Sequence, residues 1–262
     1  MAKTILAKKQ PEKALLQWIR KTGGRNSTGK ITVRHHGGGY RKLYRFVDFG
    51  QEHKDVRGKV AAIEYDPNRS SYIALIQYED GKKGYVLAPS DLQVGQEIFC
   101  AEKTEMKAGN RMQLRHMTVG TMVYNVELHP GRGGKVVRGA GTTAKVLANE
   151  DIYTHLQLPS TEIRKVQSIC YATVGVVSNP EHMYHRVANA GRMRKMGWRP
   201  TVRGSAMNPV DHPHGGGEGR TGIGLKYPKT PTGKHALGVK TRNKKKWTNK
   251  LILQRRRKKP RK

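Results

Sequence analysis

The sequence is poor in acidic residues, in large aromatic residues and in long apolar runs. It has 19 Asp and Glu against 51 Lys and Arg among 262 residues, which gives a formal net charge of +32. Three Phe, three Trp and a hydrophobic content of 35% are too little for one large core, but enough for one or two small ones. No run approaches the roughly 18 apolar residues that a membrane span needs, and the apolar part of residues 1–9 is too short for a signal peptide. A soluble chain without a membrane partner is therefore expected.

Cysteine is also scarce. Cys100 and Cys170 are the two cysteines of the chain, and neither has a second Cys or a His at metal-ligand spacing. We expect two small buried thiols, which is typical of proteins from a reducing intracellular compartment. No metal site and no cofactor are expected.

The excess positive charge indicates a polyanionic partner, because unpaired positive charges repel one another and oppose compaction. Nucleic acid, an anionic membrane and an acidic protein are the candidates. Residues 1–58 carry a net charge of +10, residues 59–130 of −1, residues 131–190 of +3, and residues 191–262 of +20. This distribution predicts a folded middle with a basic N-terminal arm, 1–58, and an extended basic C-terminal arm, 191–262.

The middle of the chain has the pattern of short β-strands separated by Gly, Pro, Asn and Ser. Asp80-Gly81 favours a tight hairpin between two apolar runs. We predict a mainly β fold of two small barrels, at 59–129 and 130–190, which join near His129–Gly131. One helix is predicted, at Pro180–Met196, with Asn179 as its cap. The expected strands cover residues 59–65, 71–78, 85–88, 96–101, 120–128, 135–137, 144–147, 155–158, 163–166 and 172–177.

Three segments combine glycine with Arg and Lys: residues 23–42, 129–135 and 198–220. Glycine lets the backbone approach a phosphate closely, and Arg can contact a phosphate bidentately. The alternation of the two in non-helical stretches predicts contact with RNA of irregular shape. The candidate RNA-binding residues are Arg25, Lys30, Arg34, His35, Gly38, Arg41, Arg132, Lys135, Arg192, Arg194, Arg199, Arg203, Asn208, His212, His214, Arg220, Arg242 and Lys245.

Two features of the C-terminal arm have competing interpretations. The arm lacks the apolar content to fold alone, so a solvated tail is one possibility. Its Met and aromatic residues, such as Trp198 and Tyr227, favour ordering against RNA with stacking on bases. The closing basic run 255–262 resembles a nuclear localisation patch, but phosphate neutralisation is preferred.

Other classes fit the sequence less well. A nucleotide-binding enzyme is disfavoured because no phosphate-binding loop has the required spacing. Asp211 beside His212 and His214 invites an acid–base or metal-dependent transferase, yet no third ligand lies nearby, and a stiff RNA-contacting turn is preferred. An architectural DNA-binding protein remains the strongest competitor. It explains the charge and not the long Gly-His-Arg segments.

The stretch Pro200–Arg220, with Asn208-Pro209-Val210-Asp211-His212-Pro213-His214-Gly215-Gly216-Gly217 at its centre, closely resembles the signature of the universal second protein of the large ribosomal subunit. Three further segments match that family in the same order: Ile31–Gly39, Glu64–Arg69 and Gly131–Gly134. The resemblance spans roughly residues 20–262, in a bacterial form, with an organellar ribosome as the lesser option.

The resemblance implies an oligonucleotide-binding-type barrel, then an SH3-like barrel, with both arms buried in large-subunit RNA. It implies a primary RNA-binding protein of assembly, a monomer within the ribosome that contacts neighbouring ribosomal proteins, supports association with the small subunit and resides in the cytoplasm. It also implies that His212 lies near the peptidyl-transferase region, that the chemistry there belongs to the RNA, and that any Mg²⁺ is shared with RNA. The chain departs from the family pattern at His36–Tyr40, Gly84 and Thr161. For the loops near Gly84 and Thr161, the contacts that the barrel faces make in the family are therefore not expected of this chain.

Overall fold

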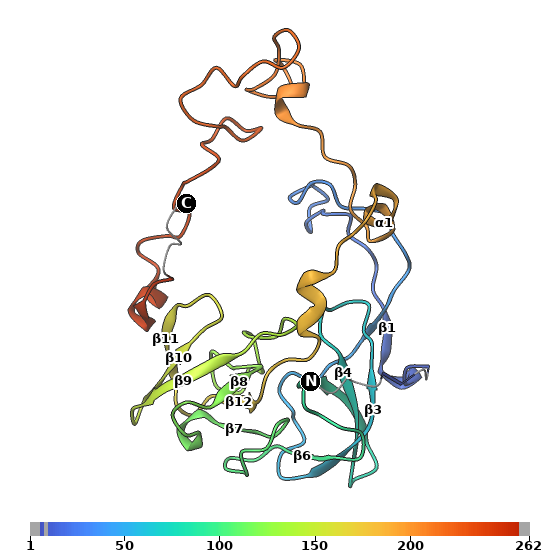
Figure 1. The fold of residues 1–262 in the computed structure, drawn as a ribbon, viewed down its shortest axis with the longest axis vertical. Helices are drawn as coiled ribbons and strands as arrows, with labels where there is room; N and C mark the ends of the chain where they lie inside the picture. Colours follow the sequence, from blue (N-terminus) through green and yellow to red (C-terminus); the bar gives the residue numbers. More distant parts are fainter. Residues whose placement is uncertain (1–5, 8–9, 257–262) are drawn as a thin grey trace. The chain divides into compact units, whose positions relative to one another are not determined.

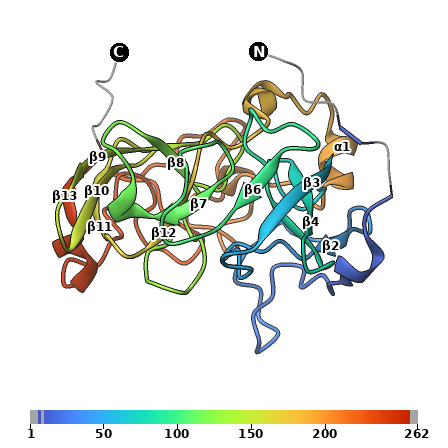
Figure 2. The same ribbon diagram turned by 90° about the horizontal axis from the view of Figure 1, so that it is seen from below.

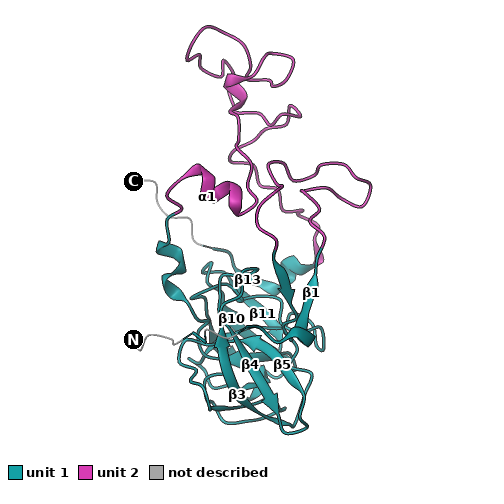
Figure 3. Cartoon of the chain, turned by 90° about the vertical axis from the view of Figure 1, so that its right-hand side faces the viewer, with its two compact units in different colours: residues 1–19, 42–186, 248–262 teal, residues 20–41, 187–247 magenta. Residues whose placement is uncertain are grey.

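The structure is a computed structural model that describes residues 6–7 and 10–256, and its regular elements are mostly antiparallel strands (Figure 1). The expectation of a mainly β chain is confirmed. Two compact units can be distinguished. Unit 1 comprises residues 1–19, 42–186 and 248–262, and unit 2 comprises residues 20–41 and 187–247 (Figure 3). The last residues of the predicted C-terminal arm, 257–262, lie outside the described part.

The first sheet of unit 1 has four strands in the order β5–β4–β3–β6. They are β3 (Arg57–Glu64), β4 (Ile73–Tyr78), β5 (Lys83–Leu87) and β6 (Glu97–Phe99). Their apolar side chains, among them Val60, Ile76 and Val86, bury one small core. The turn between β4 and β5 is the predicted hairpin at Asp80-Gly81. Gly81 has φ +78°, a left-handed conformation that glycine adopts without steric cost.

The second sheet has seven strands in the order β13–β11–β10–β9–β8–β12–β7. Its core is separate and includes Leu114, Val146 and Leu156. In Figure 2 the strands β7 to β12 lie beside the strands of the first sheet. The strands are β7 (Arg111–Gln113), β8 (Met122–Tyr124), β9 (Ala144–Asn149), β10 (Tyr153–Gln157), β11 (Ile163–Gln167), β12 (Tyr171–Val174) and β13 (Ile252–Gln254).

These two sheets are consistent with the expected oligonucleotide-binding-type and SH3-like modules, although the hydrogen bonds of neither sheet close a ring within the described residues. The division between them falls between Phe99 and Arg111, earlier than the predicted join near His129–Gly131. The Pro and Gly residues at 129–131 lie in a loop inside the second module. Strand β13 is a further difference, since it returns a piece of the predicted extended arm to β11.

The two modules pack on each other through Leu87, Tyr124 and Val177, which are buried together. The Tyr124 hydroxyl donates a hydrogen bond to the carbonyl of Leu87 at 3.0 Å. Both cysteines are free and buried, as expected. Burial raises the pKa of Cys100 to about 11 and that of Cys170 to about 12.

The predicted helix at Pro180–Met196 is interrupted. It consists of a 3-10 helix, η3 (Pro180–Tyr184), and a short α-helix, α1 (Ala190–Lys195). The side chain of Asn189 caps α1 by accepting a hydrogen bond from the amide of Arg192 at 3.0 Å. Asn179 occupies the N-cap position of η3, as predicted, but with φ +62° and with its side-chain amide donating to the carbonyl of Ser70 and not capping the helix.

The remaining elements are short. Strands β1 (Leu16–Trp18) and β2 (Leu43–Arg45) pair in unit 1 and were not predicted. None of the helices in the described part of the chain has the length and apolar character that a membrane crossing requires. The other 3-10 helices are η1 (Lys13–Leu15), η2 (Leu114–His116), η4 (Gly204–Ala206) and η5 (Trp247–Leu251).

Candidate nucleic-acid interface

Unit 2 concentrates the positive charge of the chain. Its 83 residues include 20 Lys and Arg and only two acidic residues, Asp211 and Glu218. Among these residues His212 alone is buried. Unit 2 therefore has almost no hydrophobic core to offset its charge repulsion, which is the expected state of a segment that orders against a polyanion.

The predicted RNA-binding residues lie mostly on this unit and mostly on its surface. Sixteen of the 18 belong to unit 2, while Arg132 and Lys135 belong to unit 1. His212 is buried, His35 and His214 are half-buried, and the others are exposed. Their exposure leaves the cationic groups accessible to phosphates. Contact of each residue with RNA stays a prediction.

Two distant pieces of unit 2 pair with each other, and we call residues 35–40 and 195–199 the paired strip. The amide of Gly37 donates to the carbonyl of Gly197, the amide of Tyr40 to that of Lys195, and the amide of Arg199 to that of His35, each at 2.9 Å. The strip joins the first and third glycine-rich segments. Their proximity could not be inferred from the sequence.

Glycine is required where the strip is tightest. Gly39 has φ +77°, and a Cβ atom there would lie 2.7 Å from the amide nitrogen of Gly197 and 2.8 Å from the carbonyl oxygen of Lys195. Contacts under 3 Å force the backbone to move, so the strip closes because this residue has no side chain. Gly38 also has a positive φ, of +66°, but faces open space.

Lys21 fixes the outer edge of the strip and was not recognised from the sequence. Its ammonium group donates to the carbonyls of Gly38, Gly39 and Tyr40 at 2.9, 2.7 and 2.7 Å. Three acceptors match the three protons of a lysine ammonium group. Lys21 thus shapes the loop, whereas Arg34 and Arg199 are exposed.

A compact loop at residues 24–33 presents two of the candidate cations. The Asn26 side chain accepts hydrogen bonds from the amides of Thr28 and Lys30, both at 3.0 Å, and the amide of Val33 donates to the carbonyl of Gly24 at 3.1 Å. These local hydrogen bonds close the loop. Arg25 and Lys30 are exposed on it.

The histidine segment is held by its own backbone. The amide of His214 donates to Nδ1 of His212 at 3.0 Å, and the amide of Lys229 donates to Nε2 of His214 at 2.8 Å. Each ring therefore accepts a hydrogen bond at one nitrogen, which fixes its orientation. Burial, followed by the charges of His212 and Lys229, lowers the pKa of His214.

This arrangement does not resemble an acid–base pair. Nδ1 of His212 is occupied by a backbone amide, while Asp211 is exposed. Within the described residues there is no cluster of three or more His, Cys, Asp and Glu side chains that could hold a metal ion. Both histidines instead shape the turn. A Cβ at Gly204 would lie 2.5 Å from two ring atoms of His212, so the ring packs directly on this backbone.

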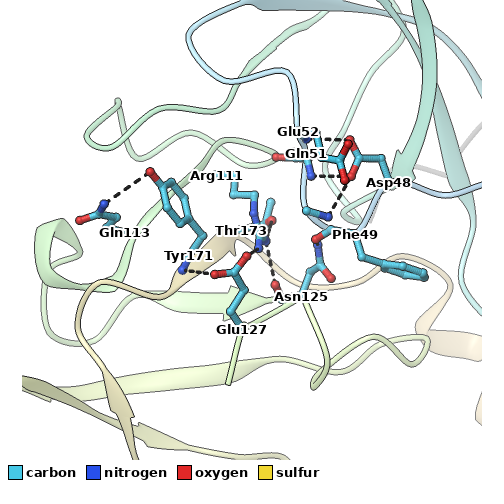
Figure 4. Close-up of polar contacts among 11 residues, drawn as sticks. Asp48, Phe49, Gln51, Glu52, Arg111, Gln113, Asn125, Glu127, Tyr171 and Thr173 are labelled. Carbon is cyan, nitrogen blue, oxygen red and sulfur yellow. Dashed lines mark hydrogen bonds and ion pairs between the residues drawn. The ribbon is translucent and has the colours of Figure 1, made fainter. Parts of the chain in front are cut away.

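The second glycine-rich segment lies in unit 1 and is held by a polar network around Arg111 (Figure 4). The Arg111 guanidinium is fully buried and contacts Glu127 at 3.0 Å, the carbonyl of Asn125 at 2.8 Å and the hydroxyl of Thr173 at 3.2 Å. The Glu127 carboxylate in turn accepts a hydrogen bond from the amide of Tyr171 at 3.1 Å. No signal in the sequence indicated that this arginine, on a short strand, would be buried.

The same network positions the loop that carries Arg132 and Lys135. The side-chain amide of Asn125 and the amide of Gly134 both donate to the carbonyl of Phe49, at 3.0 and 2.9 Å. A Cβ at Gly134 would collide with the Asn125 side chain. The loop borders a cavity of about 820 Å³, and Lys54, Arg132, Lys135 and Tyr171 are among its lining residues.

Two models of known protein domains match the chain. Residues 12–100 match the family described as Ribosomal Proteins L2, RNA binding N-terminal domain. Residues 107–233 match the family described as Ribosomal Proteins L2, C-terminal domain. The two matches meet between Phe99 and Arg111, where the two sheets also divide.

Proposed function

The chain belongs to the ribosomal protein L2 family, and from that premise we propose that it anchors large-subunit ribosomal RNA mainly through unit 2. Its general role follows from the family: it is a structural, RNA-binding constituent of the ribosome that acts in translation. In our proposal it is a primary binder that supports assembly and subunit association. It also supports the region around the peptidyl-transferase centre, with His212 on the side of the chain nearest to that region.

The observation that supports this most is the combination of charge and burial in unit 2. Twenty Lys and Arg on a segment with one buried residue cannot reach a compact state through apolar burial. Phosphate contacts neutralise such charge, and each contact adds about −0.7 to −0.9 to the slope of log affinity against log salt. Irregular RNA offers the loops and bulges that a shaped, non-helical segment can follow.

Partners and chemistry follow the same proposal. Ribosomal RNA and other ribosomal proteins are partners of the family, and the ribosome is its location. For this chain we propose a cytoplasmic ribosome, a contact with the small subunit at the interface, and a single copy in each ribosome. No catalytic residue and no cofactor belong to the protein in this proposal, and any Mg²⁺ is shared with RNA.

Sedimentation tests the proposal in cell extract. Two full-length variants are compared with the parent chain. The unit 2 charge variant is Arg192→Gln, Arg194→Gln and Arg203→Gln, and the unit 1 charge variant is Lys59→Gln, Lys103→Gln and Lys145→Gln. All six side chains are exposed.

The tagged parent chain is expected to migrate with large subunits and whole ribosomes. During salt washes the unit 2 charge variant should leave them first, with the unit 1 charge variant close to the parent. Migration of the parent chain with DNA would favour the architectural alternative and contradict the proposal.

A further inference from the structure

Trp198 combines exposure with a fixed backbone. It keeps 45% of its surface exposed although it lies in the paired strip. Its amide donates to the carbonyl of Met193 at 3.1 Å, and it forms an antiparallel bridge with His36. A large aromatic side chain held in this way remains available to a ligand without a further ordering cost.

His36 supports one side of the indole. The two ring centroids are 4.3 Å apart, with an angle of 45° between the ring planes. This contact restricts the rotation of Trp198 and leaves the exposed part of its ring system facing outward. The exposed part of the indole thus offers a flat aromatic face, inclined by 45° to the His36 ring, in a segment that otherwise offers cations and glycine.

The surroundings of this surface are uniformly basic. Residues 20–41 and 187–210 contain no Asp and no Glu. Arg199 directly follows Trp198 in the chain, Arg34 lies two positions before His36, and both arginines are exposed. The stem of Arg199 passes near Gly37, where a Cβ would lie 3.7 Å from its Cδ atom. Cations beside an aromatic surface complement a nucleotide, which has an aromatic base and an anionic phosphate.

We propose that Trp198, supported by His36, stacks one unpaired RNA base while Arg34 and Arg199 neutralise the neighbouring phosphates. The inference rests on the proposed RNA-binding function and adds a stacking site to it. A base within a duplex has both faces covered, so only an unpaired base can use this surface. Its occupant is therefore a bulged or single-stranded nucleotide.

The test uses the full chain with Trp18→Phe and Trp247→Phe, so that Trp198 is the one remaining tryptophan. The probes are a short single-stranded adenosine oligonucleotide and an abasic oligomer with the same number of phosphates. The base-containing oligomer should quench the fluorescence of Trp198 and bind more tightly. With affinity measured by the anisotropy of end-labelled oligomers, Trp198→Ala should weaken binding of the base-containing oligomer roughly tenfold, the usual scale of one base–aromatic stack, without affecting the abasic oligomer.

A matched variant separates stacking from folding. Trp198→Phe keeps an aromatic ring and should retain most of the preference for bases. Equal binding of the two oligomers by the parent chain would overturn the stacking site while leaving phosphate-based RNA binding intact. An equal loss of both oligomers in Trp198→Ala would also overturn it, because that pattern indicates damage to the strip. Failure of the parent chain to bind either oligomer or large-subunit RNA would overturn the proposed function as well.

Discussion

Unit 1 and unit 2 are built by opposite means. Unit 1 buries several small apolar clusters and carries a net charge of +14, whereas unit 2 buries a single histidine and carries +18 on fewer than half as many residues. Strands and side-chain packing order the first. Glycine turns and main-chain hydrogen bonds shape the second, and in our proposal RNA completes its stability.

The difference extends to the use of arginine. In unit 1 Arg111 is buried and paired with Glu127, and it supports the interior of the second sheet. In unit 2 Arg192, Arg194 and Arg199 are exposed. The same residue type thus has a structural role in one unit and is available to phosphate in the other, and four experiments can sharpen or break this contrast.

The largest effect on stability is expected for Arg111→Ala. Removing one partner of a buried ion pair leaves Glu127 uncompensated and should lower the free energy of unfolding of unit 1 by about 3–5 kcal/mol. Chemical denaturation monitored by far-UV circular dichroism measures it. Arg115→Ala is the matched control, since Arg115 pairs with Glu102 at the surface and should cost about 0–1 kcal/mol. Equal losses would contradict the assigned interior role.

A smaller, local effect is expected in unit 2 for Gly39→Ala. The added Cβ meets the backbone of Gly197 and Lys195, and the positive φ adds strain, for a combined cost of about 1–3 kcal/mol. Hydrogen exchange of the Gly37 and Tyr40 amides should accelerate about tenfold or more. Gly38→Ala shares the positive φ but meets open space, so its acceleration should be smaller. Equal acceleration in Gly39→Ala and Gly38→Ala would contradict a role for the close approach of the two backbone segments at Gly39.

The smallest effect is a pH dependence at the histidine turn. Because the pKa of His214 is lowered in the folded chain, the folded form binds fewer protons than the unfolded form near that pKa. The bond from the Lys229 amide to Nε2 is intact at neutral pH. It should be lost as the pH falls below the usual histidine pKa of about 6.5 and through the lowered value.

Hydrogen exchange again provides the measurement. Protection of the Lys229 amide should fall on acidification, after correction for the intrinsic exchange rate. The amide of Lys234 donates to the hydroxyl of Thr230, which does not titrate in this range, and serves as the control. Protection of Lys229 that is constant from neutral to acidic pH would contradict a neutral acceptor at His214.

The sequence predicted the local features of unit 1 well. The hairpin at Asp80-Gly81 and the strands around it follow from alternation and turn residues, which are properties of neighbouring positions. Strand β7 was missed because Arg111 is a charged residue at a fully buried site, and β13 because its three residues lie in a basic segment. Each has three residues, too few to show the alternation that identifies a longer strand.

The candidate interface was predicted in composition and not in geometry. The glycine-rich segments and their cations were identified because their residue types are visible one by one. The paired strip, the ammonium group of Lys21 and the histidine turn depend on contacts between residues 15 to 164 positions apart or on backbone hydrogen bonds. His212 is an example. Its ring accepts a hydrogen bond from the backbone amide of His214, and this contact is not visible in the residue types.

The most direct test of the contrast is the salt dependence of binding to large-subunit ribosomal RNA. The parent chain, the unit 2 charge variant and the unit 1 charge variant are titrated over a range of salt concentrations. Loss of three cations from unit 2 should reduce the magnitude of the log–log slope by about 2 to 3, whereas loss of three cations from unit 1 should leave it nearly unchanged. Equal slopes for the two variants would contradict the account, because affinity would then follow total charge and not the surface of unit 2.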